Sequence, residues 1–134
     1  MAEKIEGRAR ELIEQPNFAA VATVREDGRP QVNVVWADTD NGHVVLNSAE
    51  GRQWPENLRR DPERVSVTVV NHENPYEYVT IEGRLAEATH DGADENIDAL
   101  AKKYLDADEY PFRQPGEQRV LLRIEPERVR VQGG

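Results

Sequence analysis

One stretch of the chain combines residues that bind anions: Asn47–Pro62, with the sequence NSAEGRQWPENLRRDP. Arg52, Arg59 and Arg60 lie inside it and Arg64 follows it. Small polar residues and a glycine before "ENLRR" indicate a loop that enters a short helix. The N–H groups at a helix N-terminus and the guanidinium of an arginine both bind phosphate. The stretch therefore predicts an anion site, and surface ion pairs are the alternative for Arg52, Arg59 and Arg60.

Two amides on one predicted strand, PQVNVVW, are the second candidate for binding chemistry. Gln31 and Asn33 share one face of this strand, and Val32, Val34 and Trp36 share the other. Uncharged amides supply both donors and acceptors, which match the edge of a neutral heteroaromatic ring. A solvated outer face is the alternative for the two amides.

Other chemistries have little support in the sequence. The chain has no cysteine, which excludes disulfides, thiol catalysis and zinc–thiolate sites. His43, His72 and His90 stand singly beside turns without the spacing of a metal pair, so we expect no metal site. No serine lies in a Gly-x-Ser-x-Gly elbow, and "GRQWPEN" lacks the Gly-Lys-[Ser/Thr] ending of a nucleotide-binding P-loop.

Composition narrows the class of protein. The formal net charge of −9 argues against nucleic-acid binding, which needs a broad positive surface. No window of eighteen apolar residues exists, so we expect no membrane-spanning segment and a cytoplasmic location. At 134 residues, the simplest expectation is one domain over residues 1–134.

The elements that must position these residues follow from periodicity. Ile5, Ala9, Leu12 and Ile13 have helical spacing and predict a helix that stops at Pro16. Alternating apolar residues predict strands at 18–25, 30–38, 39–48, 64–70, 78–89 and 118–131, the last of them broken at Glu125-Pro126 into one or two strands. Helices are expected within 56–62 and 91–106. About six antiparallel strands and three helices predict a small barrel with helices packed outside it.

The order of these segments resembles a known family. "FAAVATVREDGRPQVNVVW", "LNSAEGRQWPENLRRDPERVSVTVV" and "YVTIEGRLAEAT" are similar to the split-barrel proteins of the pyridoxamine-phosphate-oxidase-like superfamily. Within it, the chain most resembles the branch of coenzyme F420-dependent oxidoreductases. The resemblance implies a mainly β fold with flanking helices, namely the six-stranded antiparallel FMN-binding split barrel. It also implies a homodimer with the cofactor in a groove at the subunit interface.

The resemblance further implies roles for single positions. Gln31 and Asn33 fall where contacts to the cofactor ring or its ribityl chain are expected. At the phosphate end, the matching positions are Asn47, Ser48 and Arg52, with Asn57 nearby in the helix.

Two positions depart from the family pattern. Trp54 stands where many relatives carry a phosphate-binding lysine, and Gln53 replaces an arginine or lysine of the flavin-mononucleotide members. The missing charges weaken the case for flavin mononucleotide (FMN). Trp54 either contacts the cofactor or anchors its helix in the core.

The leading hypothesis is an enzyme that uses coenzyme F420 to deliver a hydride to an electron-poor small-molecule substrate. Three alternatives are an FMN-dependent reductase or oxidase of the same fold, a non-catalytic protein that binds a flavin-like or tetrapyrrole ligand, and a barrel without a cofactor. No catalytic residue is assigned; Tyr76, Tyr78 and Tyr104 are candidate proton donors or ring neighbours, with packing as their alternative role.

Overall fold

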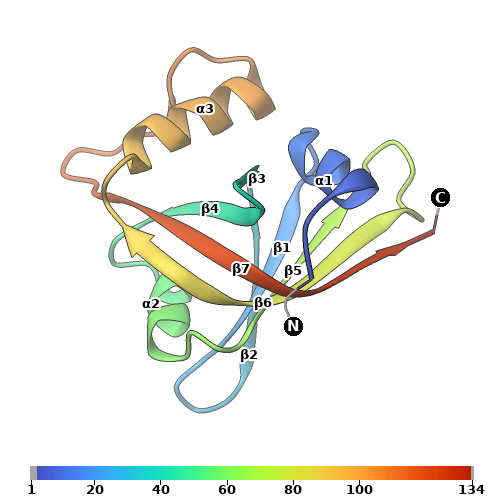
Figure 1. The fold of residues 1–134 in the computed structure, drawn as a ribbon. Coiled ribbons are helices and arrows are strands. Elements are labelled where there is room, and N and C mark those ends of the chain that lie inside the picture. Colours follow the sequence, from blue (N-terminus) through green and yellow to red (C-terminus); the bar gives the residue numbers. More distant parts are fainter. Residues whose placement is uncertain (1–2, 134) are drawn as a thin grey trace.

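A computed structural model describes residues 3–133, in which seven strands and three helices follow one another along the chain (Figure 1). Their bounds are α1 (Gly7–Glu14), β1 (Ala19–Val24), β2 (Pro30–Val35), β3 (Ala37–Asp40), β4 (His43–Ala49), α2 (Gln53–Arg60), β5 (Val65–Val70), β6 (Tyr78–Thr89), α3 (Ala93–Leu105) and β7 (Arg119–Gln132). The mainly β fold with flanking helices is therefore confirmed.

All strands belong to one antiparallel sheet with the order β2-β1-β5-β6-β7-β4-β3. The two edge strands, β2 and β3, are separated in sequence by Trp36 alone. The sheet must therefore curl until its edges meet at this residue, which makes a barrel split at the β2–β3 junction (Figure 1). The predicted strand at 30–38 is thus two strands, and this break accounts for seven strands where six were expected.

The long strand β7 runs unbroken through Pro126, where the sequence allowed either one strand or two. Pro126 pairs with Gly83 of β6, and the register shifts between Glu82 and Gly83. A Cβ at Gly83 would collide with the backbone carbonyl of Glu125, so this close approach requires a glycine.

The core lies inside the curled sheet, where α1 closes one side. The predicted helical stripe of Ile5, Ala9, Leu12 and Ile13 is buried, at 6% exposure or less. On β5 the predicted inward valines are also buried. In α3, Leu105 is 44% exposed because the helix ends there and the next residue is left-handed.

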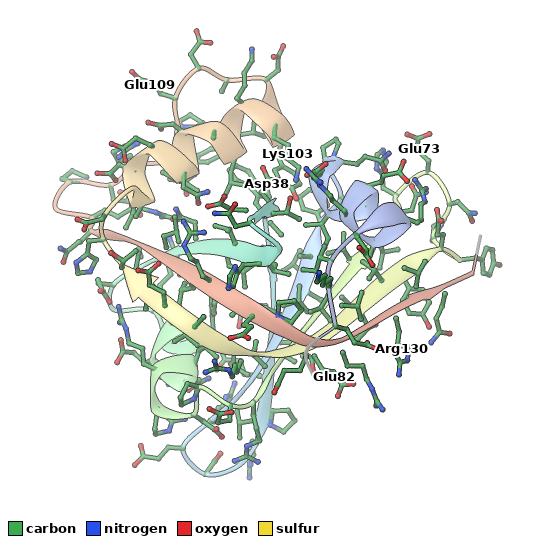
Figure 2. The ribbon with its side chains drawn as sticks, in the orientation of Figure 1. Asp38, Glu73, Glu82, Lys103, Glu109 and Arg130 are labelled. Atoms are coloured by element: carbon green, nitrogen blue, oxygen red, sulfur yellow. The ribbon has the colours of Figure 1, made fainter. Side chains whose placement is uncertain are left out.

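Helix α3 is tied to the split of the barrel by two adjacent side chains. Lys103 Nζ donates to the carbonyls of Ile13 and Ala37, both at 2.6 Å. Tyr104 Oη donates to the carbonyl of Asn17 at 2.6 Å and accepts from the N–H of Ala37 at 3.1 Å. Figure 2 shows Lys103 and Asp38 facing each other between α3 and β3. Burial lowers the pKa of Lys103 and raises the pKa of Tyr104 to about 12.

Among the described residues, none of the helices has the length and hydropathy of a membrane-spanning segment.

Candidate functional site

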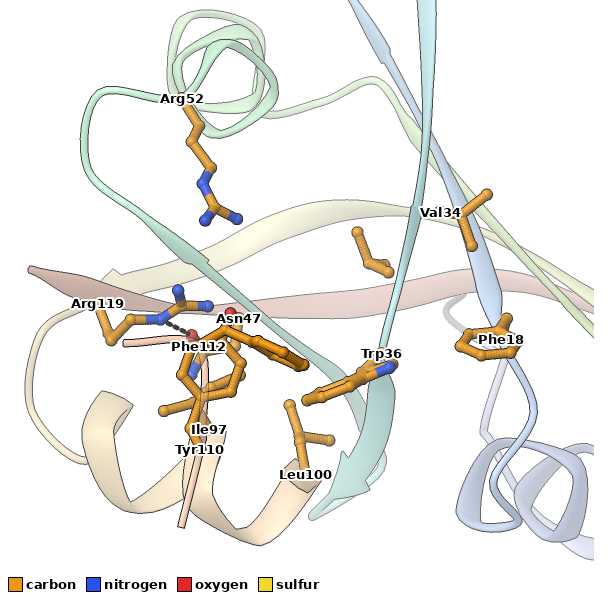
Figure 3. A pocket seen from close by; sticks show the side chains of 11 residues that line it. Phe18, Val34, Trp36, Asn47, Arg52, Ile97, Leu100, Tyr110, Phe112 and Arg119 are labelled. Atoms are coloured by element: carbon orange, nitrogen blue, oxygen red, sulfur yellow. Dashed lines mark hydrogen bonds between the residues drawn. The ribbon is translucent and has the colours of Figure 1, made fainter. Parts of the chain in front are cut away.

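A pocket of about 220 Å³ opens at the split of the barrel, between the end of β2 and helix α3 (Figure 3). Its walls come from β2, β4, β7, α3, the loop before α2 and the loop after α3. The lining residues are Phe18, Val34, Val35, Trp36, Asn47, Arg52, Ile97, Leu100, Tyr110, Phe112 and Arg119. The β2–β3 break, which the sequence did not reveal, is what opens this space.

Part of the pocket wall is aromatic. Trp36 stacks on Tyr104 with ring centroids 5.2 Å apart and an interplanar angle of 6°. Tyr110 meets Trp36 edge-on at 6.1 Å, and Phe112 meets Tyr110 edge-on at 5.7 Å. Phe112 is 59% exposed, so its ring lies at the mouth. Flat apolar walls of this kind suit a planar ring.

Two arginines also line the pocket, next to its aromatic residues, and the guanidinium of Arg119 lies 5.1 Å from the centroid of the Tyr110 ring. Arg52, at the N-cap of α2, is half-exposed, and its side chain extends towards Arg119 and Phe112 (Figure 3). The side chain of Arg119 is 3% exposed, and its Nε donates to Asn47 Oδ1 at 2.9 Å. Asn47 in turn donates to the carbonyl of Ala93 and to Asn96 Oδ1, at 2.8 and 2.9 Å. Asn47 therefore fixes Arg119 to α3.

A buried carboxylate lies between the two arginines. Glu117 Oε1 is 3.0 Å from Arg119 Nη1 and 3.7 Å from Arg52 Nη2. The side chain of Glu117 is 6% exposed, and its Oε2 has no hydrogen-bond partner within residues 3–133. Glu117 is not among the lining residues, but its carboxylate offsets part of the positive charge of the two arginines.

Four of the predicted site residues form a separate amide cluster. Asn57 Nδ2 donates to Gln31 Oε1 at 3.1 Å, and Gln31 Nε2 donates to Asn33 Oδ1, also at 3.1 Å. Gln53 Nε2 donates to Asn57 Oδ1 at 2.8 Å, and Asn57 also donates to Thr23 at 3.1 Å. The cluster joins β2 and β1 to α2, and the pocket lining does not include it.

The amides of β2 lie on the inward face of the sheet. Asn33 pairs with buried Val21 of β1, whereas Val32 and Val34 on the opposite face are 64% and 72% exposed. The alternative of a solvated outer face for Gln31 and Asn33 is therefore wrong, and the apolar residues of this strand are the ones that face outward.

Ser48 and Trp54 lie in the interior. Ser48 alternates with Asn47 on β4 and shares the inward face with Leu46, so its fully buried hydroxyl is turned away from the pocket. Trp54 is 4% exposed and packs in the main core cluster. Of the two alternatives for Trp54, this placement fits a helix anchor.

The arginines of the opening stretch divide between two roles. Arg59 makes a two-pronged ion pair with Glu50, at 2.7 and 2.8 Å, and this hydrogen bonding holds the pKa of Glu50 at about 2. Arg64 pairs with an aspartate at 2.7 Å, and Arg60 donates to a backbone carbonyl at 2.8 Å. Within the described chain, Arg52 alone of the four lines the pocket.

Sequence reasoning missed the residues contributed by the segment after α3. Tyr110, Phe112 and Arg119 lie in or just after "YPFRQPGE", the segment that follows the helix expected within 91–106. Two aromatic residues in a loop rich in proline and glycine were the available signal, since such a loop exposes apolar side chains without an evident core to fill. Among residues 3–133, no group of three or more His, Asp or Glu side chains could hold a metal ion.

Comparisons with known proteins give a matching family and several structures of similar fold. A family model described as pyridoxamine 5'-phosphate oxidase matches residues 5–133. A solved structure named F420 reductase has a TM-score of 0.80 and 26% identity, over 94% of this chain and 98% of that chain. A conserved hypothetical protein from Mycobacterium tuberculosis has a TM-score of 0.72 and 23% identity, over 98% and 88% of the two chains.

A putative pyridoxamine 5'-phosphate oxidase from Listeria innocua has a TM-score of 0.67 and 20% identity, over 90% of this chain and 92% of that chain. No curated protein matches the sequence. The structures from Mycobacterium tuberculosis and Listeria innocua share the fold with this chain. The F420 reductase structure has the highest sequence identity of the three.

Proposed function

The chain belongs to the pyridoxamine 5'-phosphate oxidase family, and on that premise we propose that it is an oxidoreductase that holds coenzyme F420 in the pocket at the split of the barrel. Its substrate would be an electron-poor organic molecule that accepts a hydride. One observation carries the proposal: the pocket combines the aromatic side chains of Trp36, Tyr110 and Phe112 with the guanidinium groups of Arg52 and Arg119. The F420 reductase of similar structure supports the choice of cofactor.

The residues present fit such a cofactor. Trp36 and Phe112 offer faces to a planar deazaflavin ring. Arg52 and the N-terminus of α2 offer donors to a phosphate, and the half-exposed guanidinium can reach it without leaving a buried partner. The bound deazaflavin would supply the hydride, so the protein needs only to orient the ring and to exclude water. This explains why no acid–base pair is needed in the lining.

The charge of the pocket also matters for an anionic ligand. A chain of net charge −9 repels anions at long range, and the local excess of positive charge at Arg52 and Arg119 offsets this field at the site. We therefore expect Arg52 and Arg119 to contribute strongly to cofactor affinity, although the chain as a whole is negatively charged.

We further propose that the protein acts as a homodimer, with the pocket at the subunit interface. The pocket is smaller than the roughly 300–1,000 Å³ that encloses a typical ligand. Phe18 and Val34 line both the pocket and an adjoining apolar surface that includes Ala20 and Val70. A second copy that covers this surface would enclose the exposed side of the ligand.

Val34→Asp tests the dimer. The substitution places a charge on the outer face of β2, so we expect sedimentation to show monomers and cofactor affinity to fall at least tenfold. A Val34→Asp variant that stays dimeric and binds normally would contradict this arrangement.

A titration tests the cofactor. Coenzyme F420 should bind more tightly than FMN, as followed by fluorescence of the deazaflavin or flavin. Arg52→Ala should weaken binding by about 1.5–3 kcal/mol, because a charge-assisted phosphate contact is lost. Arg29→Ala is the matched control, since Arg29 is 78% exposed and lies outside the pocket lining.

The results separate the alternatives. Tighter binding of FMN would favour a flavin enzyme, and binding without turnover of any electron-poor acceptor would favour a non-catalytic ligand carrier. If neither cofactor binds at micromolar concentration, the proposal is wrong.

A further inference from the structure

Arg119 is a buried arginine of the pocket wall whose contacts within the protein leave part of its guanidinium free. Its side chain is 3% exposed. Nε donates to Asn47 Oδ1 at 2.9 Å, and Nη1 donates to Glu117 Oε1 at 3.0 Å. Nη2 has no hydrogen-bond partner within residues 3–133, and unlike the unpartnered oxygen of Glu117 it is accessible to solvent. Because Arg119 lines the pocket, the two N–H groups of Nη2 are available to a ligand there.

The position of this guanidinium is fixed by β4 and by the loop after α3. Asn47 of β4, which holds Nε, itself donates to the carbonyl of Ala93 at 2.8 Å and to Asn96 Oδ1 at 2.9 Å. The guanidinium carbon lies 5.1 Å from the centroid of the Tyr110 ring. A donor held in this way loses little conformational entropy when a ligand binds, so Nη2 is preorganised.

The surroundings of Nη2 favour a negative charge on the ligand. Most of the pocket lining near Arg119 is apolar, and burying a cation beside such a wall is unfavourable unless its donors are paired. Arg52 is the other charged residue of the lining, and among the described residues no carboxylate belongs to it. A ligand oxygen that accepts from Nη2 would therefore complete the hydrogen bonding of Arg119 in a locally positive pocket.

The free nitrogen also restricts the kind of anion. Only Nη2 is available, so Arg119 cannot make the two-pronged contact that suits a carboxylate, and a single oxygen fits better. The pocket volume is about 220 Å³. A cavity of about 150 Å³ is enough to bind benzene, so this pocket has room for one substituted ring against Trp36, Tyr110 and Phe112.

We propose that Arg119 binds the ionised oxygen of a planar aromatic ligand, a phenolate or a similar ring-bound oxyanion. This inference rests on the proposed function and gives the substrate class for it: an electron-poor ring that carries an ionised hydroxyl group. Arg52 keeps its proposed role towards the phosphate of the cofactor.

The test compares 4-nitrophenol with nitrobenzene, two probes that share the nitrophenyl ring, on the purified protein without added cofactor. Binding is followed by quenching of tryptophan fluorescence, to which Trp36 of the pocket contributes. Fully ionised 4-nitrophenol should bind about 10- to 100-fold more tightly than nitrobenzene, which is the size of one charge-assisted hydrogen bond. Visible absorbance reports the ionisation of the bound probe, whose pKa should fall by about one unit for each tenfold preference for phenolate over phenol.

A pair of variants isolates Arg119. Arg119→Gln alone would leave Glu117 buried without its cation, so it is combined with Glu117→Gln. The double variant should lose the preference for the phenolate, whereas the matched control Glu117→Gln, which keeps Arg119, should retain it. Arg52→Ala removes the other cation of the pocket and should keep most of the preference.

The outcomes are distinct. Equal affinities for the two probes in the unmodified protein, or an unchanged preference in the double variant, would overturn the role of Arg119. Should the double variant not fold, an unshifted pKa of bound 4-nitrophenol in the unmodified protein, or a shift that disappears in Arg52→Ala, would refute the inference. If coenzyme F420 binds while the probes bind alike, only this inference fails. If the phenolate binds tightly but coenzyme F420 does not bind, the proposed function and the substrate class both fail, and the anion site at Arg119 stands.

Discussion

Tyr104→Phe separates a structural role of this tyrosine from a chemical one. The hydroxyl donates to the carbonyl of Asn17 at 2.6 Å and accepts from the N–H of Ala37 at 3.1 Å. Both Asn17 and Ala37 are at most 1% exposed. The substitution keeps the ring that stacks on Trp36 at 5.2 Å, so it removes only the polar contacts.

The magnitude follows from these contacts. Losing the hydrogen bond to Asn17 costs about 0.5–1.5 kcal/mol, and depriving the buried N–H of Ala37 of this acceptor costs about 1–3 kcal/mol. Allowing for relaxation, the free energy of unfolding should fall by about 2–3 kcal/mol. With a urea m-value of about 1–3 kcal/mol per M, the unfolding midpoint should shift by about 1 M.

Urea unfolding at a fixed protein concentration measures this shift, because the stability of a dimer depends on concentration. Tyr76→Phe is the control: Tyr76 is 84% exposed, and its substitution should change stability by less than about 0.5 kcal/mol. Tyr104 does not line the pocket and its O–H donates to the carbonyl of Asn17, so it should not supply a proton during turnover. A Tyr104→Phe variant with unchanged stability but abolished turnover would refute the structural role.

Three further predictions concern positions away from the pocket lining. Gly83→Ala should lower the free energy of unfolding by about 1–3 kcal/mol in urea titration, because its Cβ would meet the carbonyl of Glu125. Trp54→Lys should lower the free energy of unfolding by at least about 3 kcal/mol, because Trp54 is 4% exposed and packs in the core. A well-folded Trp54→Lys variant that binds FMN more strongly would show instead that this position faces a phosphate. The ion pair with Arg59 depresses the pKa of Glu50 from 4.5 to about 2, so the stability that this pair contributes is complete above pH 4.5 and is lost as the pH falls towards 2. In urea titrations from pH 6 to pH 3, Arg59→Gln should therefore reduce the decrease in stability with falling pH. An unchanged pH dependence in this variant would exclude the ion pair as its source.

The sequence predicted those parts of the fold that depend on local periodicity. The stripe of α1, from Ile5 to Ile13, and the valines of β5 are buried as expected because one apolar face is enough to specify a half-buried element. The break at Trp36 could not be predicted in this way. The pattern of apolar residues continues through it, and only the curl of the whole sheet requires the chain to change from one edge to the other.

The candidate site was predicted in part for a related reason. Asn47 lies near the end of β4 and Arg52 lies at the N-cap of α2, so the short turn between these elements brings both residues to the pocket. The amides at Gln31 and Asn57 come together over a long sequence separation, at 3.1 Å. The amide side chains indicated that each residue could bind a ligand. In the structure, however, the amides hydrogen-bond to one another, and these bonds depend on how α2 packs on β1 and β2.

The arginine-rich stretch shows why clustering in sequence is weak evidence for a shared site. Arg59 and Arg60 lie in the last turn of α2, roughly 10–12 Å along the helix axis from Arg52 at its N-cap. Each meets a partner on its own side: a carboxylate for Arg59 and a strand carbonyl for Arg60. The second cation of the pocket is instead Arg119, which is distant in sequence and anchored by Asn47. An anion site at this split therefore depends on the pairing of β4 with β7, which brings Asn47 and Arg119 together, and loss of that pairing should abolish ligand binding even if Arg52 is intact.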